Sequence, residues 1–446
     1  MSFEELQKLM HDSGIVGAGG AGFPSYAKLD RRADTIILNC AECEPLLRLH
    51  RHLLAHKVNE ILHALDVIAK TVGVKNVIIA TKAAYTQTVS AIEAALPSFE
   101  NIHICKLKEV YPAGDEVILI YEATGRVVAP GALPISVGVN VFNTETVYNI
   151  YRALNGTPVT HKYITIAGEV KNPQTFLAPL GTPYSLLIEK AGGVTTDHPA
   201  YIIGGPMMGS LGSADDVVKK TSNAVIVLPD DHYVVKRKQV NFKIDMKRAM
   251  AACCQCRYCT DLCPRHLLGH PIQPHEFMRV LSNHDFQNIE PYSDAMYCSG
   301  CGLCEMYSCG QGLSPRALIG VFKSEMRKQG YKVPAGELTP VPEDRSLRRV
   351  PLERLRGRLD LEKYNKSAPI TEEAILPETV KLMLSQHVGI PASPVVKLGD
   401  AVKAGQIAAQ AAEGKLSVPV HCPIDGIVTE VTGQFIIVHR NGGNEA

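Results

Sequence analysis

The chain has 446 residues, a length that on ordinary domain sizes corresponds to about three domains. Its 46 Lys and Arg residues balance 45 Asp and Glu residues, so no net charge draws it to nucleic acid. It has no apolar run of about 18 residues and no basic-then-apolar leader. We therefore expect no membrane span, no secretory signal and a cytoplasmic location.

Residues 1–155 predict an α/β domain. A helix with apolar residues at helical spacing comes first, followed by the glycine run GAGGAGFP at residues 17–24. This run satisfies G-x-G-x-x-G, but no strand precedes it and no long helix follows it, so it fits the usual dinucleotide turn poorly. Strand-like and helix-like runs then alternate, which predicts a Rossmann-like parallel sheet covered by helices. The strand-like runs are 35–40, 76–81 and 102–107, and the helix-like runs are 56–73 and 83–99.

The remaining chain divides into four segments of different composition. Residues 156–235 have short β-like runs and one helical piece, which indicates a small α+β module. Residues 236–330 contain short helical segments with most of the cysteines, and residues 331–372 form a Pro-, Glu- and Arg-rich linker or wrapping segment. Residues 373–446 have short strands with glycine turns, which predict a small sandwich.

Nine of the 13 cysteines lie between residues 253 and 309, and such clustering without an export signal favours metal ligation over disulfides. The first run is C-x2-C-x2-C-x3-C-P and the second is C-x2-C-x2-C-x4-C. The first is the bacterial ferredoxin run, whose fourth cysteine binds the other cluster. We therefore predict two [4Fe–4S] clusters with crossed ligation: Cys253, Cys256, Cys259 and Cys309 for one, and Cys263, Cys298, Cys301 and Cys304 for the other.

Three features of the cysteine region bear on the predicted ligand sets. Structural zinc would use paired C-x2-C knuckles separated by a longer loop, so it fits these runs less well. The second run has one extra residue before Cys309, and Gly310 stands where proline is usual. Cys254 has no place in either set, and we interpret it as a bystander.

The glycine run and NCAECEP (residues 39–45) together resemble the flavin-binding subunit of respiratory complex I, and still more the C subunit of Rnf-type electron-transport complexes. In that family the glycine loop holds the FMN phosphate, since glycines let backbone N–H groups approach an anion closely. YPAGDE (111–116) and NTET (143–146) resemble its later flavin-contacting elements. By this resemblance the cofactor-binding residues are Gly17, Gly19, Gly20, Gly22, Phe23, Lys28, Asn39, Glu42, Glu44, Tyr111, Gly114, Asp115, Glu116, Asn143 and Thr146.

The resemblance extends over most of the chain. Residues 160–215 resemble the family's β-grasp module, a soluble-ligand-binding (SLBB-like) fold, and the tail resembles its barrel-sandwich hybrid domain. Rnf C subunits have the sandwich at the N-terminus, whereas here it comes last. That order most resembles the cobalamin reductases of propanediol-utilisation microcompartments. The implied fold is a multidomain α/β protein with a two-cluster ferredoxin-like helical domain.

The resemblance implies an NADH-dependent reductase that uses FMN and two [4Fe–4S] clusters to reduce cobalamin to cob(I)alamin for adenosylcobalamin regeneration. It implies cobalamin, an ATP:cob(I)alamin adenosyltransferase and a microcompartment shell protein as partners, inside a bacterial microcompartment. Three alternatives remain: a peripheral Rnf-like NADH:ferredoxin subunit, an electron-transfer protein of another microcompartment, and a non-catalytic iron–sulfur docking module.

Three further features have two interpretations each. Lys415 lies about where a lipoyl lysine would, but a plain surface lysine is favoured because fold membership does not confer function. Cys40 and Cys43 form a C-x-x-C, which we interpret as loop packing rather than a redox dithiol. Six arginines between residues 345 and 358 are explained equally well by partner docking and by an amphipathic linker helix.

Overall fold

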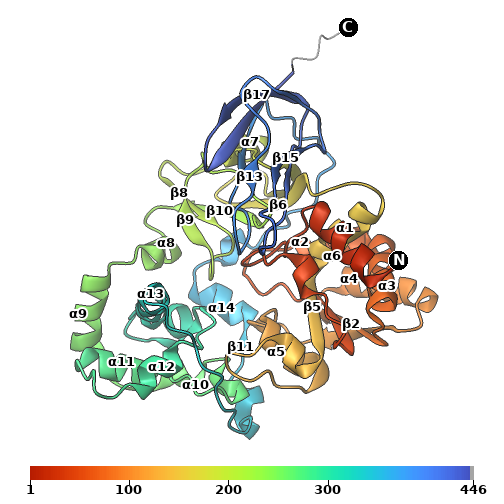
Figure 1. Ribbon diagram of the computed structural model, residues 1–446. Helices are drawn as coiled ribbons and strands as arrows, with labels where there is room; N and C mark the ends of the chain where they lie inside the picture. The colour runs from red at the N-terminus through yellow and green to blue at the C-terminus, as the bar shows by residue number, and fades with distance from the viewer. Residues whose placement is uncertain (442–446) are drawn as a thin grey trace.

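The computed structural model describes residues 1–441, and the first domain is built on a four-stranded sheet (Figure 1). The strands are β1 (Thr35–Cys40), β2 (Asn76–Lys82), β3 (Ile102–Leu107) and β5 (Val139–Asn143). All neighbours are parallel, in the order β3-β2-β1-β5, which confirms the predicted Rossmann-like sheet. The strand order reverses between β1 and β5, and the carboxyl ends of strands at such a point form a crevice where ligands bind.

Helices cover both faces of this sheet because successive strand side chains point to opposite faces. Ile36 and Leu38 share a core with α1, α2, α3 and α6, whereas Ile37 packs in a second core with α5. The first helix begins with a capping box between Ser2 and Glu5. The helices are α1 (Phe3–Asp12), α2 (Leu49–His56), α3 (Val58–Val72), α4 (Thr86–Ala95), α5 (Glu116–Thr124) and α6 (Thr144–Leu154).

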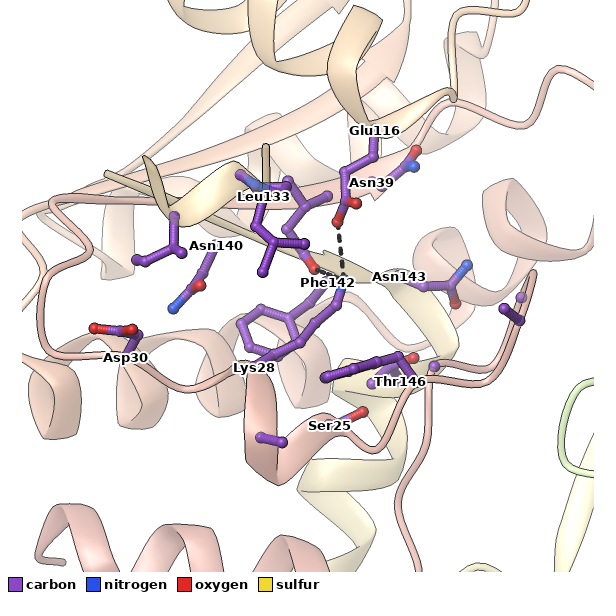
Figure 2. A pocket seen from close by; sticks show the side chains of 18 of the residues that line it. Ser25, Lys28, Asp30, Asn39, Glu116, Leu133, Asn140, Phe142, Asn143 and Thr146 are labelled. Carbon is purple, nitrogen blue, oxygen red and sulfur yellow. Dashed lines mark hydrogen bonds and ion pairs between the residues drawn. The ribbon is translucent and has the colours of Figure 1, made fainter. Parts of the chain in front are cut away.

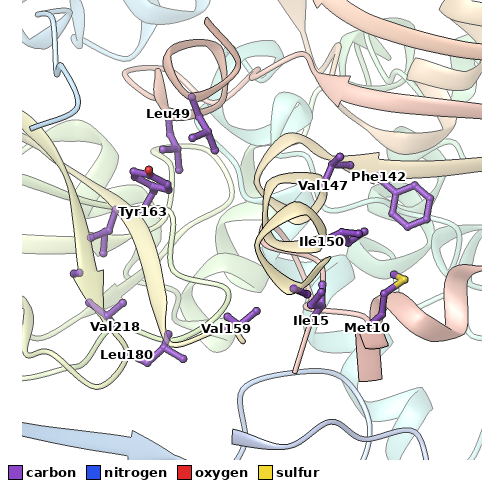
Figure 3. Packing of buried hydrophobic residues seen from close by; sticks show 14 of the residues in the cluster. Met10, Ile15, Leu49, Phe142, Val147, Ile150, Val159, Tyr163, Leu180 and Val218 are labelled. Carbon is purple, nitrogen blue, oxygen red and sulfur yellow. The ribbon is translucent and has the colours of Figure 1, made fainter. Parts of the chain in front are cut away.

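A mixed five-stranded sheet follows, in the order β7-β6-β10-β8-β9. Only its β6–β10 pair is parallel. This module shares a core with the first domain: Val147 and Ile150 of α6 belong to the same buried cluster as Val159, Tyr163 and Leu180 (Figure 3). Its elements are β6 (His161–Gly168), β7 (Gln174–Pro179), α7 (Tyr184–Lys190), β8 (Pro199–Ile203), β9 (Ser210–Gly212) and β10 (Ala224–Pro229).

The cysteine-rich domain is helical and lies to one side of the molecule, next to α5 and β11 (Figure 1). Its core contains an aromatic group in which the rings of Phe277, Tyr292 and Phe322 pack within 5.9 Å of one another, centroid to centroid. Its helices are α8 (Tyr233–Lys238), α9 (Phe242–Ala252), α10 (Tyr258–Asp261), α11 (Pro274–Ser282), α12 (Glu290–Ala295) and α13 (Pro315–Lys328).

The segment after α13 wraps back over the first domain. Its strand β11 (Val350–Pro351) pairs with β4 (Val110–Tyr111), and α14 (Leu352–Arg358) buries two leucines. The guanidinium groups of Arg345 and Arg349 pair with the Glu122 carboxylate at 2.6 and 2.9 Å. These arginines therefore hold the wrapping segment to the chain's own first domain.

The last domain contains two small sheets, β12-β18-β17-β14 and β13-β15-β16. Its strands are β12 (Thr379–Met383), β13 (Ser393–Pro394), β14 (Ala401–Val402), β15 (Ile407–Gln410), β16 (Val420–His421), β17 (Gly426–Val431) and β18 (Phe435–Arg440). The sandwich is the expected fold for this part of the chain. Within residues 1–441, no helix has the length and apolar character needed to span a membrane.

Candidate cofactor sites

A cavity of about 580 Å³ opens beside the carboxyl ends of β1 and β5 (Figure 2). This volume lies within the usual range for cofactor pockets. Ten of the residues expected at a flavin site line it: Gly17, Gly19, Gly22, Phe23, Lys28, Asn39, Gly114, Glu116, Asn143 and Thr146. The structure thus brings together segments that are more than 100 residues apart in the sequence.

The glycine loop presents backbone rather than side chains to this cavity. Gly20 and Gly22 have φ values of +84° and +71°, a region that side-chain-bearing residues rarely adopt. A Cβ on Gly19 would lie 3.0 Å from the Asn223 amide nitrogen and 3.2 Å from that of Asn143. The loop is anchored at its start, where Ala18 N–H donates to Thr146 Oγ1 at 2.9 Å. Gly20 belongs to the loop although it is not among the lining residues.

Lys28 places a positive charge at the cavity. Figure 2 shows its Nζ donating to Glu116 Oε1 at 2.9 Å and to the Val141 carbonyl at 3.1 Å. It lies at the end of a short 3-10 helix, Ser25–Lys28, that follows the glycine loop. An anion entering the cavity would compete with Glu116 for this ammonium group.

Two asparagines line the cavity from the carboxyl ends of β1 and β5. Asn39, at the end of β1, donates from Nδ2 to the Gly114 carbonyl at 3.0 Å. Asn143 ends β5 and caps α6, because its Oδ1 accepts from Glu145 N–H at 2.9 Å. Both side chains are therefore fixed by the sheet edge at which they lie.

Glu42 and Glu44, also expected at the pocket, lie outside its lining. The Glu42 carboxylate accepts from Arg51 N–H at 3.2 Å and is buried. The Glu44 carboxylate accepts from the backbone N–H groups of Met207 and Met208, both at 2.8 Å, and burial raises its pKa. Glu44 therefore fastens the first domain to the β-grasp module.

Tyr111 and Asp115 also lie outside the lining and face the cysteine-rich domain. Tyr111 is 2% exposed, and its hydroxyl donates to the Cys301 carbonyl at 2.6 Å. Asp115 caps α5 and pairs with Arg265 at 2.9 Å. The YPAGDE segment thus contacts the cavity through Gly114 and Glu116 and the cysteine domain through these two residues.

Several lining residues were not expected from the sequence. Asn140 lines the cavity, and its buried Nδ2 has no hydrogen-bond partner among residues 1–441. Asp30, Arg32 and the 70% exposed Leu133 also line it. Asn140 lies on β5, a strand that the sequence analysis did not single out, and Leu133 lies on a loop with no local signal.

These features fit FMN. Glycine backbone and the Lys28 ammonium are suited to a phosphate, and helix- and strand-end amides to the polar edge of a ring system. The unpartnered Asn140 Nδ2 is a buried donor of the kind that a bound group would satisfy.

The first cysteine set surrounds a second cavity, of about 560 Å³. Cys253, Cys256, Cys259 and Cys309 all line it, so Cys309 lies with the first run despite its distance in sequence. Cys256 is exposed and the other three are half-buried. Cys254 lines the same cavity and is exposed.

The second cysteine set lies deeper. Cys263, Cys298, Cys301 and Cys304 line one small cavity, with Cys263 and Cys304 buried. Gly300 N–H donates to Cys298 Sγ at 3.3 Å, and Lys323 donates to the Cys298 carbonyl at 2.6 Å. This set is the one that Tyr111 and Arg265 connect to the first domain.

The donor chemistry of both sets fits [4Fe–4S] clusters, which take four cysteine thiolates each. None of the 13 cysteines, which all lie within the described residues, forms a disulfide bond, so all eight cysteines of the two sets are available as cluster ligands. Burial raises the pKa of Cys259 to about 12 and that of Cys263 to about 11, so these thiolates need positively charged iron to form. Within residues 1–441, no three His, Cys, Asp or Glu side chains converge as a single metal ion would require.

Family models match four successive parts of the chain. They are the Nuo51 FMN-binding domain at residues 10–152, the SLBB domain at 163–210, the 4Fe-4S dicluster domain at 252–314 and the RnfC barrel sandwich hybrid domain at 359–444. An FMN-binding domain joined to a 4Fe–4S dicluster domain defines the class: the protein is a flavo-iron–sulfur electron-transfer oxidoreductase.

Comparison with individual proteins shows to which family within this class the chain belongs. Cobalamin reductase PduS of Citrobacter freundii is 40% identical over 439 residues, covering 98% of this chain and 97% of the relative. That of Salmonella typhimurium is 39% identical over 442 residues, covering 99% and 97%. The C subunit of the Na⁺-translocating ferredoxin:NAD⁺ oxidoreductase complex of Acetobacterium woodii is 32% identical, and the match covers 60% of this chain and 59% of that one. The chain therefore belongs to the cobalamin reductase PduS family.

Proposed function

We propose that the protein is an NADH-dependent reductase that uses FMN and two [4Fe–4S] clusters to reduce cob(III)alamin and cob(II)alamin to cob(I)alamin. The observation that carries this proposal is the 2.6 Å contact between the Tyr111 hydroxyl and the Cys301 carbonyl. It joins the segment that lines the flavin-type cavity to the second cysteine set. The full-length similarity to cobalamin reductases supplies the substrate.

In this proposal the chain's own residues bind and orient the cofactors. The glycine loop and Lys28 hold the FMN phosphate, while Asn39 and Asn143 fix the polar edge of its ring system. When bound, FMN exchanges hydride with nicotinamides and single electrons with iron–sulfur clusters, which is the chemistry needed between NADH and a one-electron acceptor. The eight cysteines, in their two sets of four, hold the clusters.

The cellular setting is part of the same proposal. We infer from the family that the protein works inside a bacterial microcompartment, with a shell protein as a neighbour. An ATP:cob(I)alamin adenosyltransferase would consume the cob(I)alamin, a strongly reducing product that must be captured as it forms.

An anaerobic assay tests this function. Protein loaded with iron, sulfide and FMN receives NADH and cob(III)alamin, and the corrin spectrum is followed with and without an adenosyltransferase and ATP. We expect cob(II)alamin first, and adenosylcobalamin when the transferase is present. If flavin and clusters bleach but the corrin is unchanged, the acceptor is wrong; if the flavin remains oxidised, the NADH donor is wrong.

A further inference from the structure

The two cysteine sets differ in their access to solvent, and this difference gives the relay a direction. The second set is partly buried and touches the first domain through Tyr111 and Arg265. The first set includes the exposed Cys256 and lines a cavity of about 560 Å³. A partner outside the protein can approach the first set closely, whereas the second set faces inward.

The chain around the first set has an unusual surface charge. Between residues 232 and 260, all within the described part of the chain, the sole carboxylate is Asp245, which is buried and accepts from Ser314. Exposed cations in the same stretch are Lys236, Lys243, Lys247, Arg248 and Arg257. Because the whole chain has a net charge of only +1, this stretch is a local concentration of positive charge.

Several of these cations are free to meet a partner. Within residues 1–441, Lys236, Lys243 and Lys247 form no ion pair, whereas Arg257 pairs with Asp261 at 3.3 Å. Lys243 and Lys247 are four residues apart on α9 and therefore lie on one face of that helix. Neighbouring α11 contributes Glu276, which is already paired with Arg279.

Exposed apolar side chains accompany the charges. Phe242, Ile244 and Met250 of α9 are 44%, 54% and 47% exposed, and Tyr258 beside the first set is 46% exposed. Large apolar groups ringed by polar ones are typical of interaction sites. We call the exposed side chains of residues 236–258 the α9 surface.

We propose that the α9 surface docks an acidic one-electron carrier protein, which exchanges electrons with the first cysteine set. The inference rests on the proposed function, since it requires a cluster at that set. Each encounter transfers one electron between the carrier and the cluster and moves no proton, so one NADH serves two carriers. The position of the cations explains the choice of partner. Arg257 lines the cavity of the first set, and Lys243 and Lys247 lie on the helix that leads directly into Cys253, so an acidic face bound to these cations lies next to the first set. Opposite charges then accelerate the encounter.

The test uses flavodoxin, an acidic one-electron carrier, as the probe. Reduced flavodoxin is mixed by stopped flow with the full chain loaded with iron, sulfide and FMN, and its one-electron oxidation is followed. The test variant is the double substitution Lys243→Glu and Lys247→Glu. The matched control is Lys397→Glu with Lys403→Glu, which makes the same charge change on exposed lysines of the sandwich domain. Equal iron content and equal spectra of the reduced clusters show that all three proteins are intact.

We expect the wild-type rate to fall as salt rises, and the α9 variant to be slower by about tenfold or more at low salt, because reversing charges at a docking face removes steering. The control should match the wild type. The α9 variant should also lose carbodiimide cross-links to flavodoxin, a readout independent of electron transfer. An α9 variant that transfers electrons and cross-links like the control overturns the proposal.

Two further measurements on the same variants test other binding partners of the α9 surface, namely an anionic membrane and a second copy of the chain. If the α9 substitutions abolish sedimentation with anionic phosphatidylglycerol vesicles but leave flavodoxin oxidation unchanged, the surface binds membranes and the proposal is wrong. If they instead convert a dimer to a monomer, the surface binds a second copy and the proposal is wrong as well. Because flavodoxin reduces the protein without NADH, failure of the NADH reaction alone contradicts the proposed function and not this docking surface.

Discussion

Lys28 is the residue on which cofactor retention most directly depends. Its ammonium group lies at the cavity and bonds Glu116, so a bound phosphate would gain a charge-assisted hydrogen bond from it. We expect Lys28→Met to weaken FMN binding by about ten- to hundredfold, since a hydrogen bond to a charged group is worth about 1.5–3 kcal/mol. Titration of the FMN-free protein with FMN, followed by fluorescence quenching, measures this change.

The controls for this prediction come from the same domain. Lys75→Met removes an exposed lysine away from the cavity and should leave FMN binding unchanged. Glu116→Gln removes the carboxylate that competes for Lys28 and should leave binding equal or tighter. Equal FMN affinities for Lys28→Met and Lys75→Met would contradict the phosphate role of Lys28.

At the residue scale, the sequence indicates contacts made by local motifs better than those made across domains. Lys28 and Gly19 belong to one short motif and both line the cavity. Glu44 belongs to an equally clear motif, but its carboxylate is bonded to Met207 and Met208, more than 160 residues away. Leu133 lines the cavity from a loop whose position depends on tertiary packing, so its sequence context has no recognisable pattern.

At the scale of elements, the two cysteine runs exchange their last members. Cys309 lines the cavity of the first run, and Cys263 that of the second. We therefore expect Cys263→Ala and Cys298→Ala to lose the same cluster and to give the same electron paramagnetic resonance spectrum. Cys309→Ala and Cys253→Ala should both give the complementary spectrum. In each case iron falls from about eight to about four atoms per chain.

Cys254→Ala is the matched control, since this thiol is in neither predicted set, and it should retain about eight irons. Identical spectra for Cys263→Ala and Cys253→Ala would mean that each run binds its own cluster. Loss of one cluster in Cys254→Ala would instead assign this cysteine as a ligand.

Elements with strong local signals were predictable almost to the residue. The strand-like runs at 35–40 and 102–107 coincide with β1 and β3, because both contain several β-branched and apolar residues. β1 is buried along most of its length, whereas β3 is an edge strand of the sheet and is partly exposed, although its sequence predicted a buried strand. The run at 56–73 contains α3 (Val58–Val72), whose C-cap is Gly73 with φ of +88°. Strand β4 had no such signal, since its partner β11 is more than 200 residues away.

At the scale of the molecule, burial across domain boundaries could not be inferred from composition. Residues 331–372 have the composition of a linker, yet Leu355, Leu359 and Leu361 of this segment are completely buried. Their cluster also contains Tyr111 and Met207, from the first two domains. Composition reports how polar a segment is on average, whereas these few leucines decide where it packs.

Lys220 also connects several domains of the protein, and its protonation makes the folding stability depend on pH. Its buried Nζ donates to the carbonyls of Gly14 and Pro419 at 2.7 and 2.8 Å, and its N–H donates to Gln386 Oε1 at 2.9 Å. It thus joins the first domain, the β-grasp module and the sandwich. Burial lowers its pKa from 10.5 to about 7. His421, which lies nearby, has its pKa lowered to about 4 by burial and so titrates in a different pH range.

The sign of the effect follows from the protons bound in each state. Between pH 7 and 10.5 the unfolded chain keeps the Lys220 proton and the folded chain has released it, so this group makes stability rise with pH. Below about pH 7 both states are protonated, and the cost of burying the charge is constant. We expect the Tm of the wild type to rise from about pH 7 to about pH 9 relative to that of Lys220→Met, in scans of both proteins across this range. Lys219→Met, at the neighbouring position, should follow the wild type. A Tm difference between wild type and Lys220→Met that stays constant with pH would show that Lys220 remains charged at the junction, held there by the two carbonyls.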